Sequence, residues 1–329
     1  MKSFAFLASL VPVATCLTAP PSGALVVSNP PKTGQYATVQ QAVNALSNTS
    51  TAEQIIFIQP GTYNEQVYIP TLRGPLTVYG HSSSDQSYSA NQVTITAGQS
   101  QQTQPSNDLT ATLRVHTSNF KLYNVNVANS FGKGSQAVAV SANNGGQGYY
   151  GVKLTGFQDT LLAENGAQLY AKSYIGGATD FIFGQRGKVW FEQCDLRVQA
   201  ASRGYITASG RSSADDGYYV INNSTVAAAP GNNVPAGAYY LGRPWRNFAR
   251  VIFQKTSMTN VVNSAGWEIW DTADERTDQV TFGEYANTGP GSQGARASFS
   301  KKLASPIDID TVLGSGYASA SWVDTAYLK

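Results

Sequence analysis

Charged side chains are scarce in this sequence of 329 residues. Asp, Glu, Lys and Arg make up only 13% of it, and the formal net charge is +2. Such a chain has no basic cluster of the kind that binds the phosphates of a nucleic acid. We therefore expect no nucleic acid partner, whereas neutral and acidic ligands are both compatible with the composition.

Cysteine and histidine are nearly absent. The sequence has two of each, Cys16, Cys194, His81 and His116, and it contains no His-Glu-x-x-His motif, so we expect no metal site. It also contains no Gly-x-Ser-x-Gly elbow, which leaves a Ser–His–Asp hydrolase poorly supported. We interpret each histidine as a strand-end residue, and Cys194 as a buried, unreactive thiol.

Long apolar runs are missing except at the N-terminus. Residues 4–14 are largely apolar and are followed by several small residues. This run is too short to span a bilayer and has the layout of a secretory signal. We expect residues 1–19 to be a signal peptide, with an approximate cleavage site, and residues 20–329 to form one secreted domain without a membrane partner.

Three asparagines lie in Asn-x-Ser/Thr sequons, which accept glycans in secreted proteins. They are Asn48, Asn222 and Asn223. Because Asn222 and Asn223 are adjacent, we do not expect both to carry a glycan.

Two aspartates in similar surroundings are the most informative residues that the sequence does contain. Asp159 lies in Gly-Phe-Gln-Asp-Thr-Leu and Asp180 in Asp-Phe-Ile-Phe-Gly, 21 residues further along the chain. A charge among apolar and aromatic neighbours is costly, so each carboxylate needs a partner or a function.

The sequence around these aspartates repeats at a similar interval. Tyr150, Tyr170 and Trp190 are 20 residues apart and lie in strand-like runs at 149–154, 168–175 and 188–196. Short strands repeated at such an interval indicate a stacked all-β solenoid. Helices are expected to be few and short, the clearest one over residues 39–46.

A solenoid would bring the two aspartates together, because residues one period apart lie on neighbouring coils about 5 Å from each other. Two carboxylates at that distance cannot both ionise freely, so we expect one raised pKa and one aspartate that stays charged. Asp159 and Asp180 would then form a nucleophile and acid/base pair.

Two glutamines accompany the aspartates. Gln136 precedes Asp159 by 23 residues, which would put Gln136, Asp159 and Asp180 on three successive coils. Gln158 directly precedes Asp159. On a shared strand the side chains of Gln158 and Asp159 would point to opposite faces, unless a turn or bulge intervenes.

An arginine and a tryptophan lie close together further along the chain. Residues 241–245 read Leu-Gly-Arg-Pro-Trp and contain Arg243 and Trp245. The planar fork of an arginine beside a carboxylate lowers the pKa of the carboxylate and fixes its orientation. Arg243 is therefore a candidate partner for one of the aspartates.

Together these motifs resemble those of the pectin methylesterase (pectinesterase) family. The matching segments follow in the same order, at residues 61–65, 136–139, 156–161, 180–184 and 241–245, and the resemblance runs from about Val26 to about Trp270. It is greater to secreted single-domain members from fungi and bacteria than to many plant members. It implies a right-handed parallel β-helix, pectin as the substrate and no metal or organic cofactor, and we expect a monomer.

The resemblance also implies a role for each polar residue. Asp180 would attack the C6 methyl ester carbonyl of a galacturonosyl unit, and Asp159 would protonate the departing methanol and later activate water. Gln136 and Gln158 would donate hydrogen bonds to the oxyanion. Arg243 would hold Asp180 ionised.

The same resemblance assigns substrate contacts. Phe183 and Trp245 would pack against sugar rings, and Gln136 and Arg243 would also bind the substrate. Trp267 and Trp270 are weaker candidates for the groove. Leu162 stands where many relatives carry tyrosine, which puts one aromatic wall of the groove in doubt, and Glu65 is interpreted as structural.

Other interpretations of these residues remain open. Asp159 could close a turn, Gln136 and Gln158 could form an internal amide ladder, and Arg243 could be a structural ion pair. The rival functions are a galacturonan hydrolase or lyase on the same fold and a wall-binding protein without activity. The products of the reaction distinguish them.

Overall fold

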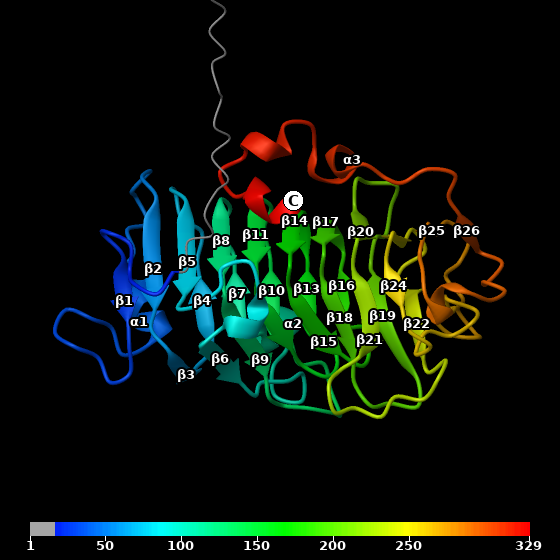
Figure 1. Cartoon of the computed structure of the whole chain (residues 1–329), viewed down its shortest axis with the longest axis horizontal. Coiled ribbons are helices and arrows are strands. Elements are labelled where there is room, and N and C mark those ends of the chain that lie inside the picture. The colour runs from blue at the N-terminus through cyan, green and yellow to red at the C-terminus, as the bar shows by residue number, and fades with distance from the viewer. Residues whose placement is uncertain (1–16) are drawn as a thin grey trace, which may run out of the picture.

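The computed structural model describes residues 17–329, so nearly all of the expected signal peptide lies outside the described residues. Within this range the chain winds into three parallel sheets of eleven, eight and seven strands, which we name sheets A, B and C (Figure 1). Neighbouring strands in sheets B and C, and in sheet A from β2 to β23, are separated by two strands of the chain, because successive strands of a coil belong to different sheets. The right-handed parallel β-helix predicted from the sequence is confirmed.

The elements have the following bounds. Sheet A contains β1 (Leu25–Val27), β2 (Gln54–Ile58), β5 (Leu76–Gly80), β8 (Phe120–Tyr123), β11 (Gln147–Tyr150), β14 (Asn165–Ala171), β17 (Arg186–Glu192), β20 (Tyr218–Asn222), β23 (Arg250–Gln254), β25 (Thr281–Tyr285) and β26 (Ser300–Lys302). Sheet B contains β3 (Gly61–Asn64), β6 (Val93–Ala97), β9 (Val125–Asn129), β12 (Lys153–Thr155), β15 (Tyr174–Gly177), β18 (Asp195–Val198), β21 (Thr225–Ala228) and β24 (Ser257–Met258). Sheet C contains β4 (Val67–Ile69), β7 (Leu113–Val115), β10 (Val140–Ala142), β13 (Leu161–Ala163), β16 (Ile182–Gly184), β19 (Gly204–Ser209) and β22 (Tyr239–Pro244). The α-helices are α1 (Val39–Asn44), α2 (Asn107–Thr110) and α3 (Ile309–Leu313), and 3₁₀ helices lie at Tyr88–Ala90, Pro290–Ser292, Tyr317–Ser319 and Thr325–Leu328.

The central coils repeat every 21 residues rather than every 20. In sheet A, Tyr149 pairs with Tyr170 and Tyr170 with Phe191. These three rings stack inside the helix, with centroids 4.6 and 5.1 Å apart. The equal spacing of Tyr150, Tyr170 and Trp190 is therefore not the register, because Tyr170 faces the interior while Tyr150 and Trp190 pack in a separate cluster outside it.

Each strand-like run expected from the sequence is two strands of different sheets. The run at 149–154 is divided between β11 and β12, and the runs at 168–175 and 188–196 are divided in the same way. The corners contain Gly151, Lys172 and Gln193, all with positive φ between 48° and 56°. A corner of two residues is too short to show the polar composition of a loop. The strand-like sequence pattern therefore continues across the corner from one strand to the next.

The predicted helix is α1, which ends at Asn44, two residues before the expected end. It buries one face against the core, through Val39, Ala42 and Val43. The carboxylate of Glu65 accepts hydrogen bonds from the backbone N–H groups of Val39 (2.8 Å) and Gln40 (2.9 Å). Glu65 thus stabilises the N-terminus of α1 by pairing free N–H groups, which is a structural role as expected.

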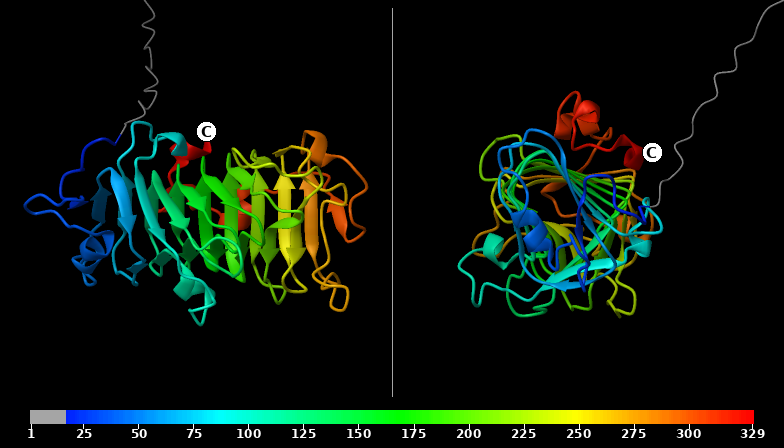
Figure 2. Two further views of the ribbon diagram at one scale, coloured as in Figure 1. Left: turned by 90° about the horizontal axis from the view of Figure 1, so that it is seen from below. Right: turned by 90° about the vertical axis from the view of Figure 1, so that its left-hand side faces the viewer.

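The segment from α3 to the C-terminus runs along the outer face of sheet A (Figures 1 and 2). The view along the helix axis in Figure 2 shows this segment outside the wound sheets, whose side chains fill the interior. The Tyr150 hydroxyl donates to the carbonyl of Trp322 (2.7 Å), and the Tyr123 hydroxyl to Asp324 (3.0 Å). The segment therefore covers the aromatic cluster that sheet A presents outward.

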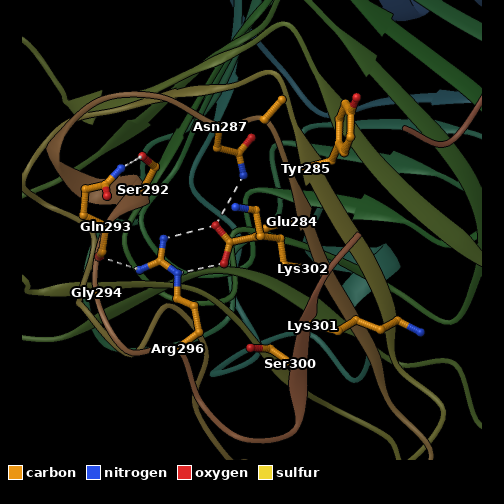
Figure 3. A pocket seen from close by; sticks show the side chains of 11 residues that line it. Glu284, Tyr285, Asn287, Ser292, Gln293, Gly294, Arg296, Ser300, Lys301 and Lys302 are labelled. Carbon is orange, nitrogen blue, oxygen red and sulfur yellow. Dashed lines mark hydrogen bonds and ion pairs between the residues drawn. The ribbon is translucent and has the colours of Figure 1, made fainter. Parts of the chain in front are cut away.

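A partly buried ion pair between Arg296 and Glu284 connects the last coils (Figure 3). The Arg296 guanidinium donates to both carboxylate oxygens of Glu284, at 2.8 and 3.1 Å. It also donates to the backbone carbonyls of Ser264 and Gly291. These bonds fix the loop around Ser292–Gly294 to strand β25 at the C-terminal end of the stack.

The remaining expectations for single residues agree with the structure. His81 follows β5 and His116 follows β7, so both are strand-end residues. Cys194 is a free, buried cysteine, and burial raises the pKa of its thiol to about 12. None of the helices in residues 17–329 is long and apolar enough to cross a membrane.

Replacing Tyr170 with alanine should lower the free energy of unfolding by about 3–5 kcal/mol, because it leaves a cavity between two stacked rings. Chemical denaturation of purified protein measures this change. Tyr285→Ala, at a half-exposed ring of β25, is the matched control and should cost much less. Equal losses at the two positions would contradict the importance of the internal stack.

Candidate active site

The outer face of sheet C carries a row of register-matched side chains. Neighbouring strands pair residues that all point away from the core, and the row crosses every strand of the sheet. Its members are Tyr68, Arg114, Ser141, Leu162, Phe183, Ala208 and Arg243. The predicted substrate contacts Phe183 and Arg243 therefore lie two strands apart on one face.

Both aspartates lie at corners that lead into sheet C. Asp159 directly precedes Thr160 and β13, and Asp180 stands in the same position before β16. Both have left-handed backbones, with φ of 65° and 48°. The Asp159 N–H donates to the carbonyl of Thr179 (3.0 Å), so the two corners are in register on adjacent coils, as predicted. Aspartate tolerates this conformation better than most residues.

The two glutamines lie beside this pair. Gln158 forms an isolated bridge with Thr179 and is followed by the bend at Asp159, so the two side chains are not bound by strand alternation. The N–H of Ala137 donates to the carbonyl of Gln158 (3.1 Å), which places Gln136 on the preceding coil. Both glutamine side chains are half-buried. The predicted placement on successive coils is confirmed.

Arg243 donates two parallel hydrogen bonds to the carboxylate of Asp180. Its Nε donates to Asp180 Oδ1 at 2.9 Å and its Nη2 to Oδ2 at 2.6 Å. The side chains are 19% and 9% exposed, so the ion pair is shielded from water on most sides. Such a planar pair fixes the carboxylate in one orientation.

The electrostatics separate the two aspartates. Burial raises the pKa of Asp180 above its usual value, and the hydrogen bonds and charge of Arg243 oppose that rise. Burial, together with the charge of Asp180, raises the pKa of Asp159 well above its usual value. At Asp180 the effect of burial outweighs that of the arginine, so its pKa is not brought below the usual value. The order is as expected, since the direct hydrogen bonds of Arg243 go to Asp180 and keep it the more acidic partner.

An apolar cluster covers the middle of sheet C on its outer face. It joins several buried residues, with Trp245 packed against them: Ala111, Val138, Leu162, Phe183 and Ala208. The ring centroids of Phe183 and Trp245 are 6.0 Å apart. Leu162, at the position where many relatives carry tyrosine, thus contributes an aliphatic side chain to this surface in place of an aromatic ring.

Trp267 and Trp270, the two other candidates for the groove, differ in burial. Trp267 is 1% exposed and stacks on Phe282 in the core, so it does not line the groove. Its neighbour Gly242 on β22 pairs with it inside the coil. Trp270 is half-buried, and the Arg243 guanidinium carbon lies 4.3 Å from its ring centre.

Tyr205 is a neighbour of Arg243 that no sequence motif indicates. The guanidinium carbon of Arg243 lies 4.0 Å from the centre of this ring. Tyr205 pairs with Tyr240 across strands β19 and β22. No motif surrounds Tyr205, and it is not the register partner of Arg243, which pairs with Ala208, so no spacing in the sequence indicates this contact.

The three sequon asparagines differ in exposure. Asn48 is exposed, whereas Asn222 is buried and its Nδ2 donates to Glu192 (2.7 Å). Asn223 is exposed, but its Nδ2 also donates to Glu192 (2.8 Å). A glycan on Asn222 or Asn223 would replace one of these bonds, so the structure favours Asn48.

Metal-binding groups do not gather around this site. In the part of the chain that the structure describes, no three His, Cys, Asp or Glu side chains form a group that could hold a metal ion. The site's polar groups are instead carboxylates, amides and a guanidinium.

Comparison with known proteins identifies this arrangement. A family model described as "Pectinesterase" matches residues 24–303. The chain belongs to the pectinesterase family. A pectinesterase from Aspergillus niger is 52% identical, with 98% of each chain covered. Members of this family are carboxylic ester hydrolases, and so is this chain.

Solved structures of the family have the same fold. A pectin methylesterase from Aspergillus niger, solved in deglycosylated form, matches with a TM-score of 0.86 and 38% identity, covering 94% of this chain and 99% of that one. The pectin methylesterase from carrot gives 0.82 and 26% identity, covering 93% and 98%. The fold and the pectinesterase resemblance inferred from the motifs are thus confirmed.

Asp159→Asn should make the protein more stable than the wild type as the pH rises. The pKa of Asp159 is raised by folding, so its stabilising contribution is complete below the unfolded pKa, near 3.8, and is lost as the pH rises through the folded value. The stabilities of the two proteins should diverge with a slope of at most about 1.4 kcal/mol per pH unit.

Thermal melting from pH 4 to pH 8 checks this expectation. Asp216→Asn is the control, because this carboxylate is 91% exposed. A stability difference between the wild type and Asp159→Asn that does not change with pH would contradict the raised pKa.

Proposed function

We propose that this chain hydrolyses the C6 methyl esters of pectin by covalent catalysis, with Asp180 as the nucleophile and Asp159 as the general acid and base. One observation carries the proposal. Arg243 holds the carboxylate of Asp180 by both oxygens, while Asp159 occupies the equivalent corner of the preceding coil. Adjacent carboxylates with separated pKa values suit a nucleophile beside a proton donor.

The first half-reaction forms an acyl-enzyme. An oxygen of ionised Asp180 attacks the C6 carbonyl carbon and forms a C–O bond, giving a tetrahedral oxyanion. The oxyanion collapses, the bond to the methoxy group breaks, and the proton of Asp159 passes to the departing oxygen, so methanol leaves. An anhydride between Asp180 and the uronate remains.

The second half-reaction restores the enzyme. Asp159, now ionised, takes a proton from water, and the resulting hydroxide adds to the C6 carbonyl. Breaking the anhydride bond releases the Asp180 carboxylate and the carboxylic acid of the galacturonosyl unit, which then loses its proton to the solvent. One water is consumed and one methanol and one acid are formed, and Asp159 again carries its proton.

Gln136 and Gln158 are the proposed donors to the oxyanion. Their half-buried amides come from adjacent coils beside the aspartate pair, which supports this role. Donors that the coils already hold in place need no reorganisation during the reaction, and this preorganisation is the reason that an oxyanion hole stabilises the transition state.

The apolar cluster on sheet C is the proposed platform for sugar rings. Phe183 and Trp245 pack together in this cluster, and Leu162 lies beside Phe183 on the neighbouring strand of the same face. Hydrogen bonds from Gln136 and Arg243 would complete the substrate contacts. The row across sheet C gives a linear polymer a straight path over several coils.

The first test follows methanol and titratable acid released from highly methylated pectin, with chain length measured in parallel. Methanol and acid without shortened chains are expected. Shortened chains without methanol would make the aspartates a glycosidase or lyase pair, and a folded protein that releases nothing would be a binding protein.

Asp180→Asn should lower kcat by at least about 10⁴-fold, because the amide is a poor nucleophile. Gln136→Ala and Gln158→Ala should each lower kcat by about 10²–10³-fold if they serve the oxyanion. Asp216→Asn is the control and should keep full activity. An Asp180→Asn variant that keeps wild-type methanol release would remove Asp180 from the mechanism.

Secretion, a monomeric state and glycosylation complete the proposal. The apolar N-terminal run supports secretion, and the deglycosylated form of the Aspergillus niger structure supports glycosylation. N-terminal sequencing of protein from the culture medium should begin near residue 20, and mass spectrometry should find a glycan at Asn48. Intact residues 1–19 on the extracellular protein would overturn the signal assignment.

A further inference from the structure

The guanidinium of Arg243 is packed against two aromatic rings. Its carbon lies 4.0 Å from the ring centre of Tyr205 and 4.3 Å from that of Trp270. These contacts leave the Nε and Nη2 groups facing Asp180. A guanidinium against aromatic faces is held by cation–π attraction and by its flat shape, so its plane is set by the rings.

Tyr205 is itself anchored. Its hydroxyl donates to Glu268 Oε2 at 2.6 Å, and Arg203 pairs with the same carboxylate. Glu268 is tied to β22 through its backbone N–H, which donates to the carbonyl of Gly242 (3.1 Å). The ring on this side of Arg243 is therefore fixed by a hydrogen bond and an ion pair.

Arg276 anchors the other ring. Its guanidinium carbon lies 4.7 Å from the ring centre of Trp270, its Nη1 donates to the carbonyl of Trp245 (2.6 Å), and its Nε donates to Asp274 (2.8 Å). Its backbone has φ of 57°, a conformation that costs energy for a residue of this size. The surrounding contacts hold Arg276 in this strained state, which points to a constraint on its position.

We infer that Trp270 and Arg276 are positioning residues, whose stack fixes the plane of the Arg243 guanidinium toward both oxygens of Asp180. The ion pair alone cannot do this, because an arginine side chain has many rotamers and can meet a carboxylate end-on. The stack removes those rotamers before the substrate arrives. This inference rests on the proposed role of Asp180 as the nucleophile.

The consequence is a measurable change in acid–base behaviour. A freed Arg243 favours the ionised form of Asp180 less, so Asp180 gains a proton at higher pH. The charged and titratable groups around Asp180 and Arg243 are Asp159, Tyr205, Glu268 and Arg203, and both stack variants leave these in place. Arg276 is a further cation on the Trp270 ring, so Arg276→Gln also removes a charge, whereas Trp270→Leu removes none.

The test compares pH profiles of kcat/KM for Trp270→Leu and Arg276→Gln with the wild type. On the acid limb kcat/KM should fall by about 10-fold in Trp270→Leu and by less in Arg276→Gln, with a smaller loss on the plateau. Trp270→Tyr and Arg276→Lys, which keep the ring and the cation, should restore most of the acid limb. Thermal melting confirms that each variant is folded.

Arg250→Gln is the matched control. The guanidinium carbon of Arg250 lies 3.6 Å from the ring centre of Tyr218 on sheet A, so it is an equivalent contact outside the site. It should leave the pH profile unchanged. A raised KM with an unmoved acid limb in Trp270→Leu would mean that this ring only contacts the substrate, and would overturn the inference.

A second measurement separates this inference from the proposed function. Stability should fall more steeply with rising pH in Trp270→Leu than in the wild type, because the folded pKa of Asp180 has risen further. This readout needs no activity. An unchanged pH dependence of stability in Trp270→Leu would contradict the positioning of Arg243 by the stack. Retained methanol release by Asp180→Asn would contradict only the assignment of Asp180 as the nucleophile.

Discussion

Everything in this molecule depends on the register of one coil on the next. Parallel strands of neighbouring coils place equivalent residues about 5 Å apart, so any side chain repeated at the coil length becomes a column. Inside the helix the columns are apolar, as in Tyr149, Tyr170 and Phe191. At the corners before sheet C the same rule puts Asp159 beside Asp180. The core and the site are thus products of a single geometric constraint.

Much of this could be predicted from the sequence, since a 21-residue separation between similar aspartate motifs already implies neighbouring coils. The fold class, the aspartate pair and the position of Gln136 follow from such spacing. The spacing of the aromatic residues alone predicts a coil of 20 residues, one fewer than the 21 residues of the strand register. Tyr150 and Trp190 belong to the outer face, and an aromatic side chain does not reveal which face it occupies.

The environment of Arg243 could not be predicted, because its neighbours come from strands and loops with no shared motif. Tyr205 lies 38 positions earlier in the chain and Trp270 follows in a loop. Sequence spacing predicts columns of register-matched residues within one sheet, whereas Tyr205 lies out of register with Arg243 on the neighbouring strand β19 and Trp270 lies in a loop. For the same reason the sequence does not distinguish Trp267, which is buried in the core, from Trp270, which is half-buried and packs on Arg243.

The returning C-terminal segment changes how the stack can come apart. A solenoid is normally a one-dimensional array in which each coil contacts only its neighbours, so its ends can fray without disturbing the middle. Here the chain leaves the last coil and bonds to Tyr123 and Tyr150 in the central coils. The array is closed into a loop of contacts, and opening of the final coils pulls on the segment that covers the centre. Cooperativity across the stack is therefore built into the chain's path as well as into its sheets.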